Sequence, residues 1–313
     1  MRIGIDAMGG DFAPAAAVAG AALAQQQLSA SDRIVLFGDE EQIVSELGKV
    51  GANPSDFDIV HCTEVIGMGE HPAKTFSKKL DSSITKGFKY LAEKSIDGFA
   101  SAGNTGAMLV GTMYTIKSIP GIIRPSIASF IPVSEQKYNL LLDVGLNPDC
   151  RPDVLYQYGI LGSLYSKIML GVDKPRVGLL NIGEEEEKGS LITKSTYDLM
   201  KDSPDFIFAG NIEGHQIFSD KKADVVVCDG FVGNVILKQA ESIYHIMKKR
   251  GISDPFFNMF NYENYGGTPI LGVNAPVIIG HGISNAKAIM NMILQTQRVI
   301  GLNLCDKIKE AFN

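Results

Sequence analysis

The sequence predicts an α/β protein with a largely parallel sheet. Short apolar strands, turns rich in Gly, Asn and Asp, and amphipathic helices alternate along the whole chain, which is typical of βαβ units. With 313 residues, 45% hydrophobic and 20% charged, the chain is able to bury a core without disulfides or metal. No linker-like tract or internal repeat interrupts the alternation. We therefore expect one continuous domain over residues 1–313, with two interlocked lobes as the alternative.

Apolar runs mark the expected strands, and helical periodicity marks the helices between them. The strands are expected at 2–6, 33–37, 57–60, 98–101, 140–143, 176–180, 206–209, 224–228 and 276–279. The helices are expected at 14–27, 40–49, 82–94, 105–115, 153–170, 191–200, 232–249 and 285–312. Apolar stretches at 127–133 and 138–143 flank a polar SEQK turn and predict a hairpin, hence at least one antiparallel pair.

Composition excludes several classes of protein. The net charge of -6 argues against a nucleic-acid-binding surface. The four cysteines are widely separated and form no CxxC pair, which argues against a zinc ribbon and favours reduced thiols in a cytosolic protein. The first residues run straight into a strand, and no apolar run reaches the length of about 18 residues that a spanning helix needs. We expect a soluble protein.

Glycine-bearing turns follow seven of the predicted strands. Glycine lets backbone N–H groups approach an anion, and a helix N-terminus adds partial positive charge. Any single turn of this kind is explained by ordinary turn chemistry, but seven at one sheet edge predict a ligand that carries phosphate or carboxylate. The turns lie at 6–11, 101–106, 143–149, 181–190, 210–214, 228–234 and 280–285.

The turn at 181–190 reads NIGEEEEKGS and directly follows a predicted buried strand. Ligands of open α/β sheets bind at the carboxyl ends of the strands, so Lys188 is expected over a crevice, with Gly189 and Ser190 opening the next helix. The alternative is a solvated acidic loop whose carboxylates favour a helix N-terminus.

Absent motifs narrow the chemistry. The sequence contains no GxSxG, HExxH or GxxxxGK[ST] motif and no complete GxGxxG, which argues against covalent serine enzymes, P-loop kinases and standard dinucleotide-binding proteins. The five histidines lack metal-ligand spacing, and only His281, between two glycines after a strand, is kept as a site candidate. The strand-end acids are expected to cap helices rather than bind a divalent cation; they are Asp6, Asp11, Asp143 and Asp229.

The turns also match a known family motif by motif. The matching segments read DAMGGDFAP from 6, SAGNTGA from 101, LDVG from 142, LNIGEEEEKG from 180, GNIEG from 210, DGFVGN from 229, YGG from 265 and HGISNAK from 281, with LGV at 271–273 and the lysines and serines of 78–83. In these segments the chain resembles the bacterial phosphate acyltransferases of the PlsX type, which belong to phospholipid synthesis. The matches run from residue 6 to residue 287.

The resemblance implies a three-layer α/β/α Rossmann-like sandwich with a mostly parallel, mixed sheet, similar to phosphate acetyltransferases and to isocitrate or isopropylmalate dehydrogenases. It implies a homodimer in which inorganic phosphate attacks the thioester of a long-chain acyl group on acyl carrier protein, giving acyl phosphate without cofactor or metal. A membrane glycerol-3-phosphate acyltransferase that consumes acyl phosphate is an implied partner. The implied location is cytoplasmic, with peripheral membrane association as an option.

The family motifs place the catalytic roles on Lys188 and Asn234. We expect Lys188 to pair with phosphate as a point charge and Asn234 to donate to phosphate or to the oxyanion, while turn amides complete the site. The expected phosphate-binding or substrate-binding set is Gly9, Gly10, Asp11, Ser101, Gly103, Asn104, Thr105, Gly106, Asn181, Gly183, Asp229, Gly230, Gly233 and His281.

Two basic clusters are candidates for docking the acidic carrier protein. One comprises Lys78, Lys79, Lys86 and Lys89, and the other comprises Lys248, Lys249 and Arg250, which lead into the apolar residues up to 260. The segment 248–264 is expected to protrude. Residues 235–264 are fewer than the family usually carries between its DGFVGN and YGG motifs, so the resemblance alone does not imply membrane contact here.

Three alternatives stay open on the sequence. A phosphate acetyl- or butyryltransferase acting on coenzyme A thioesters would share the fold and the attack by phosphate. An isocitrate-type dehydrogenase would need a metal and a nicotinamide cofactor. A non-catalytic scaffold at the membrane would rest on the 248–260 segment alone.

Overall fold

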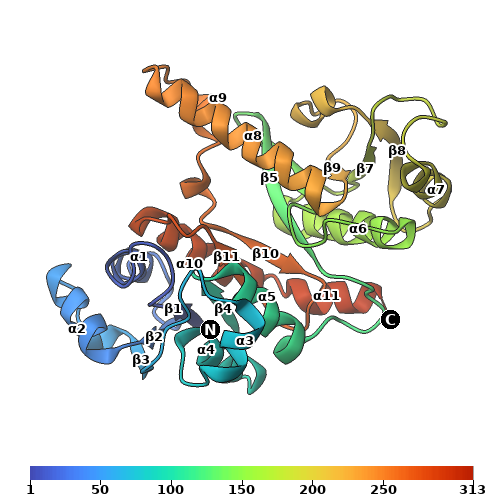
Figure 1. Cartoon of the computed structure of the whole chain (residues 1–313). Helices are drawn as coiled ribbons and strands as arrows, with labels where there is room; N and C mark the ends of the chain where they lie inside the picture. The colour runs from blue at the N-terminus through green and yellow to red at the C-terminus, as the bar shows by residue number, and fades with distance from the viewer. Residues whose placement is uncertain (313) are drawn as a thin grey trace. The chain divides into compact units, whose positions relative to one another are not determined.

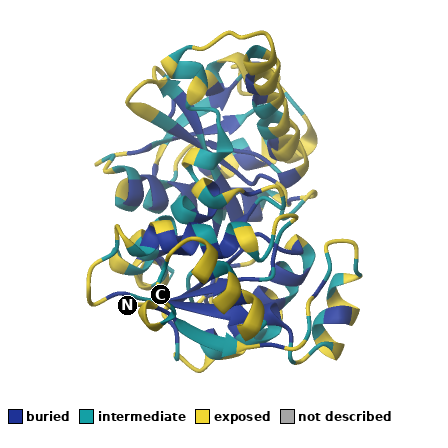
Figure 2. Cartoon of the chain, turned by 90° about the vertical axis from the view of Figure 1, so that its left-hand side faces the viewer, coloured by how far each residue is buried: buried dark blue, intermediate teal, exposed yellow. Residues whose placement is uncertain are grey.

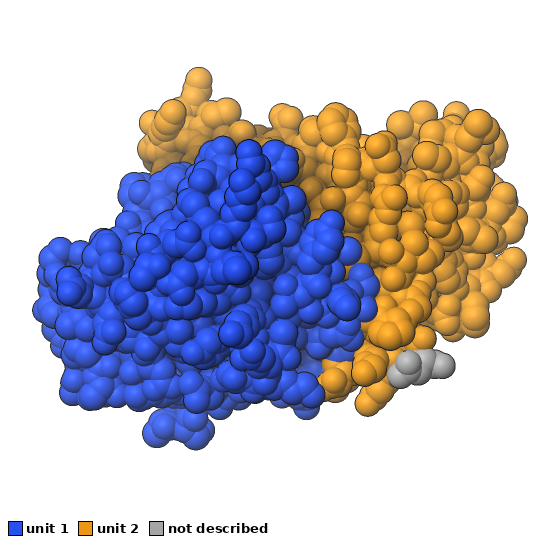
Figure 3. Space-filling model, turned by 60° about the horizontal axis from the view of Figure 1, so that its bottom comes forward, with its two compact units in different colours: residues 1–118, 262–305 blue, residues 119–261, 306–313 orange. Residues whose placement is uncertain are grey.

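The computed structural model describes residues 1–312, which divide into two compact units (Figure 3). Unit 1 comprises residues 1–118 and 262–305. Unit 2 comprises residues 119–261 together with the chain from 306 onward. Each unit is therefore built from two separate stretches of sequence.

Unit 1 contains six strands in the order β3-β2-β1-β4-β11-β10 (Figure 1). The first five are parallel, whereas β10 pairs antiparallel with β11. The register sets Ile3 of β1 opposite Ile34 of β2 and Gly98 of β4. The strands are β1 (Arg2–Asp6), β2 (Arg33–Gly38), β3 (Asp58–His61), β4 (Gly98–Ser101), β10 (Gly267–Leu271) and β11 (Val277–Gly280).

Helices cover both faces of the unit 1 sheet. Helix α10 contacts β1 and β4 and packs against α1, while α4 contacts the same two strands. Fully buried Ile3, Ile5, Phe37 and Phe99 fill the space between the layers, where the strands are dark blue in Figure 2. The helices are α1 (Ala15–Gln25), α2 (Glu40–Lys49), α3 (Pro72–Lys78), α4 (Ser83–Ala92), α5 (Thr105–Gly111) and α10 (Ala286–Gly301), and α11 (Leu304–Ala311) continues into unit 2.

Unit 2 contains five strands in the order β5-β6-β9-β7-β8. The hairpin β5·β6 is antiparallel as predicted, and the pairs β6·β9, β9·β7 and β7·β8 are parallel. Helices α6 and α7 pack together on this sheet, and α8 contacts β6. The elements are β5 (Ser126–Ser134), β6 (Lys137–Leu142), α6 (Pro152–Tyr165), β7 (Arg176–Leu180), α7 (Leu191–Met200), β8 (Ile207–Ile212), β9 (Val225–Val227), α8 (Gly230–Lys249) and α9 (Pro255–Asn258).

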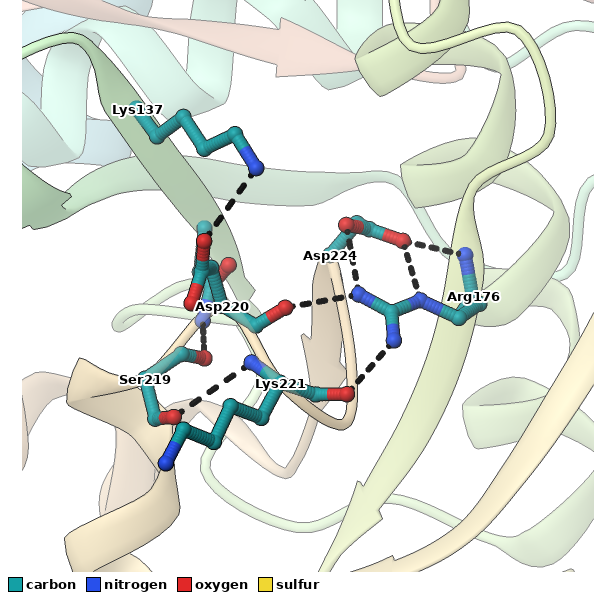
Figure 4. Close-up of polar contacts among 7 residues, drawn as sticks. Lys137, Arg176, Ser219, Asp220, Lys221 and Asp224 are labelled. Carbon is teal, nitrogen blue, oxygen red and sulfur yellow. Dashed lines mark hydrogen bonds and ion pairs between the residues drawn. The ribbon is translucent and has the colours of Figure 1, made fainter.

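A polar network holds the amino ends of β7 and β9 together (Figure 4). The Arg176 guanidinium donates from Nε and Nη2 to the two carboxylate oxygens of Asp224 over 2.9 and 3.1 Å. It also donates to the backbone carbonyls of Lys221 and Asp220. Because these contacts lie at the amino edge of the sheet, they fix the strands from the end opposite the predicted ligand turns.

Most predicted elements are confirmed, with a few differences at their ends. The helix expected over 285–312 is wrong as a single element, because Asn303 adopts φ +52 and separates α10 from α11. The last turns of the helices expected at 105–115 and 153–170 are π-helical, at Thr112–Ile116 and Ser166–Leu170. Strand β10 and helix α3 were not predicted, since β10 holds Pro269 and α3 is only 7 residues long. Within residues 1–312, no helix combines the length and apolar character needed to cross a bilayer.

Candidate active site

The carboxyl ends of the parallel strands in unit 2 gather four of the predicted turns at one edge. Strand β9 lies between β6 and β7, and β8 lies beyond β7. The turns after β6, β7, β8 and β9 therefore emerge side by side, as the strand-end rule predicts. Lys188 belongs to the turn after β7, and Asn234 belongs to the helix after the neighbouring strand β9.

The turn that carries Lys188 is fixed through its backbone. The Glu185 carbonyl accepts from the Lys188 amide over 3.1 Å and from Asn211 Nδ2 over 2.8 Å. The Lys188 carbonyl in turn accepts from Asn181 Nδ2 over 3.1 Å. The Asn211 side chain is fully buried at the end of β8, and its Oδ1 has no hydrogen-bond partner within residues 1–312. Asn181 and Asn211 thus hold the turn from two strands.

The four glutamates do not form one cluster around Lys188. Glu184 accepts from Gln216 and pairs with Lys222. The hydrogen bond from Gln216 and, after it, the contact with Lys222 hold the pKa of the Glu184 carboxyl below its usual value. Glu186 pairs with Lys201 over 3.3 Å. Only Glu185 approaches Lys188, at 4.0 Å from Nζ, and the Lys188 side chain is 46% exposed. The ammonium group is therefore open to a ligand.

Gly189 and Ser190 begin α7 as predicted. Gly189 has φ +91, and a Cβ there would lie 2.2 Å from Asn181 Oδ1, so the turn accepts only glycine at this position. The Ser190 hydroxyl accepts from the Thr193 amide over 3.2 Å and caps the helix. This close turn brings the end of β7 directly into the helix N-terminus.

The first turn of α8 packs tightly against the loop after β6. Asp229 caps the helix by accepting from the Val232 amide over 2.9 Å, and the Gly230 amide donates to the Asn147 carbonyl over 2.7 Å. A Cβ on Gly233 would lie 1.9 Å from the Asp143 carbonyl oxygen. The amides of Gly230, Val232 and Gly233 all donate inside the protein, so these two glycines serve close packing in this structure.

Asn234 follows on the exposed side of the same helix, next to the loop after β6. Its side-chain carbons lie 3.6 Å from the position of a Cβ on Gly145, which has φ +126. A side chain at position 145 would be strained by this φ, although its Cβ would make only an ordinary van der Waals contact with Asn234.

Buried Asp143 organises the loop after β6. Its carboxylate accepts from the amides of Ile127, Leu146 and Asn147 and from Asn147 Nδ2, with the shortest contact at 2.6 Å. Burial raises the pKa of the Asp143 carboxyl, and these hydrogen bonds oppose the rise. The expectation that it caps a helix is therefore wrong for Asp143, whereas it is confirmed for Asp229.

A largely apolar pocket of about 470 Å³ opens at this edge of unit 2. It lies between the turn after β7 and the first turns of α7 and α8. Its polar lining includes Asn181, Ser190 and Asp229. Its apolar lining includes Leu155, Leu179, Leu180, Ile182, Ile192, Val232 and Ile236.

The predicted residues of unit 1 gather in the same way at the carboxyl ends of β1, β4 and β11. Ser101 Oγ donates to Asp6 Oδ2 over 2.6 Å and accepts from the Gly103 amide over 2.9 Å. A Cβ on Gly9 would lie 2.3 Å from the same Asp6 oxygen. The Asp6 carboxyl is buried, which raises its pKa, and it organises these loops instead of capping a helix. The capping expectation is thus wrong for Asp6.

The remaining predicted residues of unit 1 have mixed surroundings. Asn104 caps α5 through Ala107 and donates to the carbonyls of Gly67, Met68 and Glu70, so its polar atoms are used within the fold. The Asp11 amide donates to the Gly282 carbonyl over 2.7 Å, and the N-cap of α1 is Pro14, which makes the capping expectation wrong for Asp11 as well.

The other unit 1 candidates lie on the rims of these loops. Thr105 is exposed, Gly106 faces Pro72, and Gly10 has φ +104 beside Gly282. The His281 ring lies beside the Tyr262 ring, with centroids 4.8 Å apart and the ring planes tilted by 55°. Among residues 1–312, no group of three or more His, Cys, Asp or Glu side chains is arranged to hold a metal ion.

Sequence reasoning overlooked Asn211 and Asn147. Asn147 Nδ2 donates to Asp143, to the Pro125 carbonyl and to Tyr158, so its role depends on contacts distant in sequence. Asn211 lies within the GNIEG turn, and that motif was the only available signal for it.

Two solved structures share this fold. A phosphotransacetylase from Streptococcus pyogenes superposes with a TM-score of 0.66 over 96% of this chain and 94% of its own, at 19% identity. A 4-hydroxythreonine-4-phosphate dehydrogenase from Burkholderia phymatum superposes with a TM-score of 0.51 over 95% and 98%, at 16% identity. The predicted fold class is confirmed: the chain is a Rossmann-like α/β/α protein that shares its fold with these two structures.

Sequence comparison defines the family. Residues 1–252 match the family model described as fatty acid synthesis protein. The phosphate acyltransferase of Dictyoglomus turgidum is 42% identical over 100% of this chain and 98% of its own length. The chain belongs to the phosphate acyltransferase family and is an acyltransferase of lipid synthesis.

Proposed function

We propose that the protein transfers a long-chain acyl group from acyl carrier protein to inorganic phosphate. The observation that carries the proposal is the pairing of β7 with β9, which sets the Lys188 turn and the Asn234 helix at neighbouring strand ends beside one pocket. The family supplies the acyl and phosphate chemistry, and the carrier protein is the part of the proposal that needs its own test.

The reaction needs no protein nucleophile, because a phosphate oxygen attacks the thioester carbonyl carbon. A C–O bond forms, the carbonyl oxygen becomes an oxyanion, and its collapse breaks the C–S bond. The thiolate leaves with the electron pair and takes up a proton. Lys188 offsets the negative charge of phosphate, and the Asn234 amide donates to phosphate or to the oxyanion.

The test is a phosphate-dependent assay of thiol release, with acyl phosphate trapped as a hydroxamate. Lys188→Ala and Asn234→Ala are each expected to lower turnover by about 10²- to 10³-fold, the usual effect of removing one such donor. The matched controls are Lys194→Ala on α7 and Gln239→Ala on α8, both exposed and outside the pocket. Full turnover by folded Lys188→Ala and Asn234→Ala proteins would show that the assigned roles are wrong.

The unit 1 loops are proposed to bind an anionic part of the substrates. The supporting observation is the ordered arrangement of Asp6, Ser101 and Gly103 after β1 and β4. Thr105→Val alters an exposed residue of the set without disturbing that arrangement. It is expected to raise the KM for phosphate or carrier protein, and an unchanged KM for both would remove Thr105 from the proposal.

For the carrier protein we favour the basic cluster at 248–250. In the other cluster, Lys79 is bound to Glu70 and the Val65 carbonyl, and Lys86 is bound to Asp81 and the His61 carbonyl. Lys248, Lys249 and Arg250 are all exposed at the end of α8. Lys249→Glu is expected to raise the KM for carrier protein in a salt-dependent way, with Lys89→Glu as the opposing control. The reverse result would assign docking to the first cluster.

We propose two further surfaces of unit 2. Exposed apolar side chains on α7 and α8, including Leu199, Val235 and Ile243, support a homodimer contact. Ile252, 51% exposed beside the basic cluster, supports peripheral membrane contact. Light scattering tests the first and co-sedimentation with anionic vesicles tests the second.

The four free thiols support a cytoplasmic location, and a membrane glycerol-3-phosphate acyltransferase is the proposed consumer of the product.

A coenzyme A-dependent phosphate acyltransferase is the second candidate, favoured by the shared fold with phosphotransacetylase. Comparison of kcat/KM on acyl carrier protein and acyl-coenzyme A thioesters of the same chain separates the two. A higher value on the coenzyme A thioester would replace the carrier protein in the proposal.

A further inference from the structure

The pocket at the carboxyl ends of β7 and β9 has a buried floor and apolar walls. Leu155 and Leu179 are 3% and 1% exposed and form the floor with Cys150 and Cys228. Ile192 of α7 forms one wall, and Val232 and Ile236, one turn apart on α8, form another. Its volume of about 470 Å³ lies within the range of pockets that take small organic ligands.

The chemistry of the lining selects an uncharged occupant. Burial raises the pKa of the Cys150 thiol to about 11 and that of Cys228 well above its usual value, so both thiols are neutral at physiological pH. The carboxylate of Asp229 caps α8, and the exposed Asp149 adds a second carboxylate to the lining, which disfavours an anion. A phosphate or carboxylate placed against these walls would lose its hydration without compensation, whereas a hydrocarbon chain would gain by burial.

The pocket adjoins the turn that carries Lys188, although the side chains of Lys188 and Asn234 are not part of its lining. Gly189 and Ser190 line it and directly follow Lys188. Val232 and Ile236 line it from one face of α8, whereas Asn234, two residues after Val232, lies on another side of the helix, near Gly145. Outside the floor, Ile182 of the lining and Leu191, the first residue of α7, are 82% and 84% exposed, so apolar side chains also lie on the solvent side of this edge.

We propose that this pocket holds the acyl chain of the thioester, with the carbonyl carbon at its polar end beside the Lys188 turn. The inference rests on the proposed phosphate-dependent transfer and adds the place where the chain is selected. The polar groups of Asn181 and Ser190 mark the end at which the chain meets the reacting groups, and Ile236 marks the wall that limits how much chain is buried.

The test changes the volume of the pocket and measures chain-length preference. Ile236→Phe narrows the pocket, Ile236→Ala widens it, and the control Val44→Phe introduces the same aromatic side chain at an exposed position of α2, outside the lining. Each protein is assayed with phosphate and carrier-protein thioesters from 4 to 16 carbons, and thiol release gives kcat/KM for each chain.

Burial of one methylene is worth about fourfold in binding, so excluding two of them predicts roughly a 16-fold loss. Ile236→Phe is expected to show this loss on the longest chains with little change on the shortest. Ile236→Ala is expected to shift the preference toward longer chains, and Val44→Phe is expected to retain the wild-type profile. The binding affinity for a fluorescent fatty acid, measured by direct titration, is expected to fall for Ile236→Phe in parallel.

The outcomes separate this inference from the function on which it rests. If the wild-type protein releases no thiol with phosphate at any chain length, the proposed function fails. If the wild type is active but both Ile236 variants retain its chain-length profile, or scale all chains equally, the pocket does not hold the acyl chain. A change only in oligomeric state or in vesicle binding would also overturn the inference and assign the pocket to those surfaces.

Discussion

Gly233 offers the sharpest test of how packing serves the proposed site. A Cβ at this position would lie 1.9 Å from the Asp143 carbonyl oxygen and 3.0 Å from Cys228 Sγ. The obstacle is backbone that is itself fixed by the buried Asp143 carboxylate, so Gly233→Ala must move the start of α8 outward. Reaching even a tight contact of 3.0 Å requires a shift of about 1.1 Å.

Two effects on stability partly cancel in this variant. Overpacking costs roughly 1–3 kcal/mol, and the gain in helix propensity from Gly to Ala returns about 1 kcal/mol. The folded protein should therefore survive with a modestly lower unfolding midpoint. Asn234 moves with the helix, and a displacement of about 1 Å at a reacting group typically lowers turnover by roughly 10²-fold.

The assay compares phosphate-dependent thiol release with thermal unfolding of the same samples. Gly48→Ala is the matched control, since Gly48 also lies in a helix and a Cβ there meets nothing within 4 Å. The control is expected to be slightly more stable and fully active. A Gly233→Ala protein with wild-type turnover would refute the reasoning that close packing of α8 on the Asp143 loop positions Asn234.

Four further predictions concern other parts of the chain. Burial raises the pKa of Asp6, so the native state keeps a proton that the unfolded chain releases. The stability that this group contributes is therefore present at low pH and is lost as the pH rises through the raised pKa. In denaturant titrations the stability advantage of the wild type over Asp6→Asn should shrink from pH 4 to pH 7, and a constant difference would contradict this. Arg176→Lys should lower the free energy of unfolding by about 1 kcal/mol, because lysine cannot make the bidentate contact with Asp224. The effect is small because the arginine is partly exposed. An unchanged urea midpoint would show that the network in Figure 4 does not stabilise the sheet. Asn211→Ala should cost roughly 1–3 kcal/mol and lower phosphate-dependent turnover by releasing the Glu185 carbonyl, and turnover equal to wild type would remove Asn211 from the support of the turn. Iodoacetamide should label Cys305 alone in the native protein, because the other three thiols are buried, and mass spectrometry that found early labelling at another cysteine would contradict the packing.

The fold was predictable because its signals are local. Strands such as 2–6, 98–101 and 176–180 are short apolar runs bounded by turn residues, and the structure reproduces them residue for residue. The break at Asn303 was not predictable, since apolar periodicity continues through it and the positive φ arises from the fold. Strand β10 was not predicted because its own sequence, which contains Pro269, gives a weak strand signal. The strand is defined instead by its antiparallel pairing with β11.

The candidate site was predictable only as a set of turns. The sequence identified the turn of Lys188 and the helix of Asn234, and the strand order confirms that they follow neighbouring strands. It did not separate ligand-facing residues from packing residues: Gly230 and Gly233 carry the same motif signal as the others but lie against the backbone of the 143–147 loop. That distinction depends on long-range contacts, which a turn motif does not encode.

The buried acids show what the loops of this fold require. Asp229 caps α8 by accepting from the Val232 amide in the first turn of the helix. This contact is local in sequence. Asp6 and Asp143 are instead buried after β1 and β6, where desolvation raises the pKa of each carboxyl and opposes folding at neutral pH. Each carboxyl instead accepts hydrogen bonds from backbone or hydroxyl groups of its loop. Asp6 accepts from Ser101 in unit 1, and Asp143 accepts from the Asn147 amide in unit 2. Loops that only connected strands and helices would not need such fixation, so these two carboxyls indicate that both sets of loops must hold a defined shape, as a site for an anionic substrate requires.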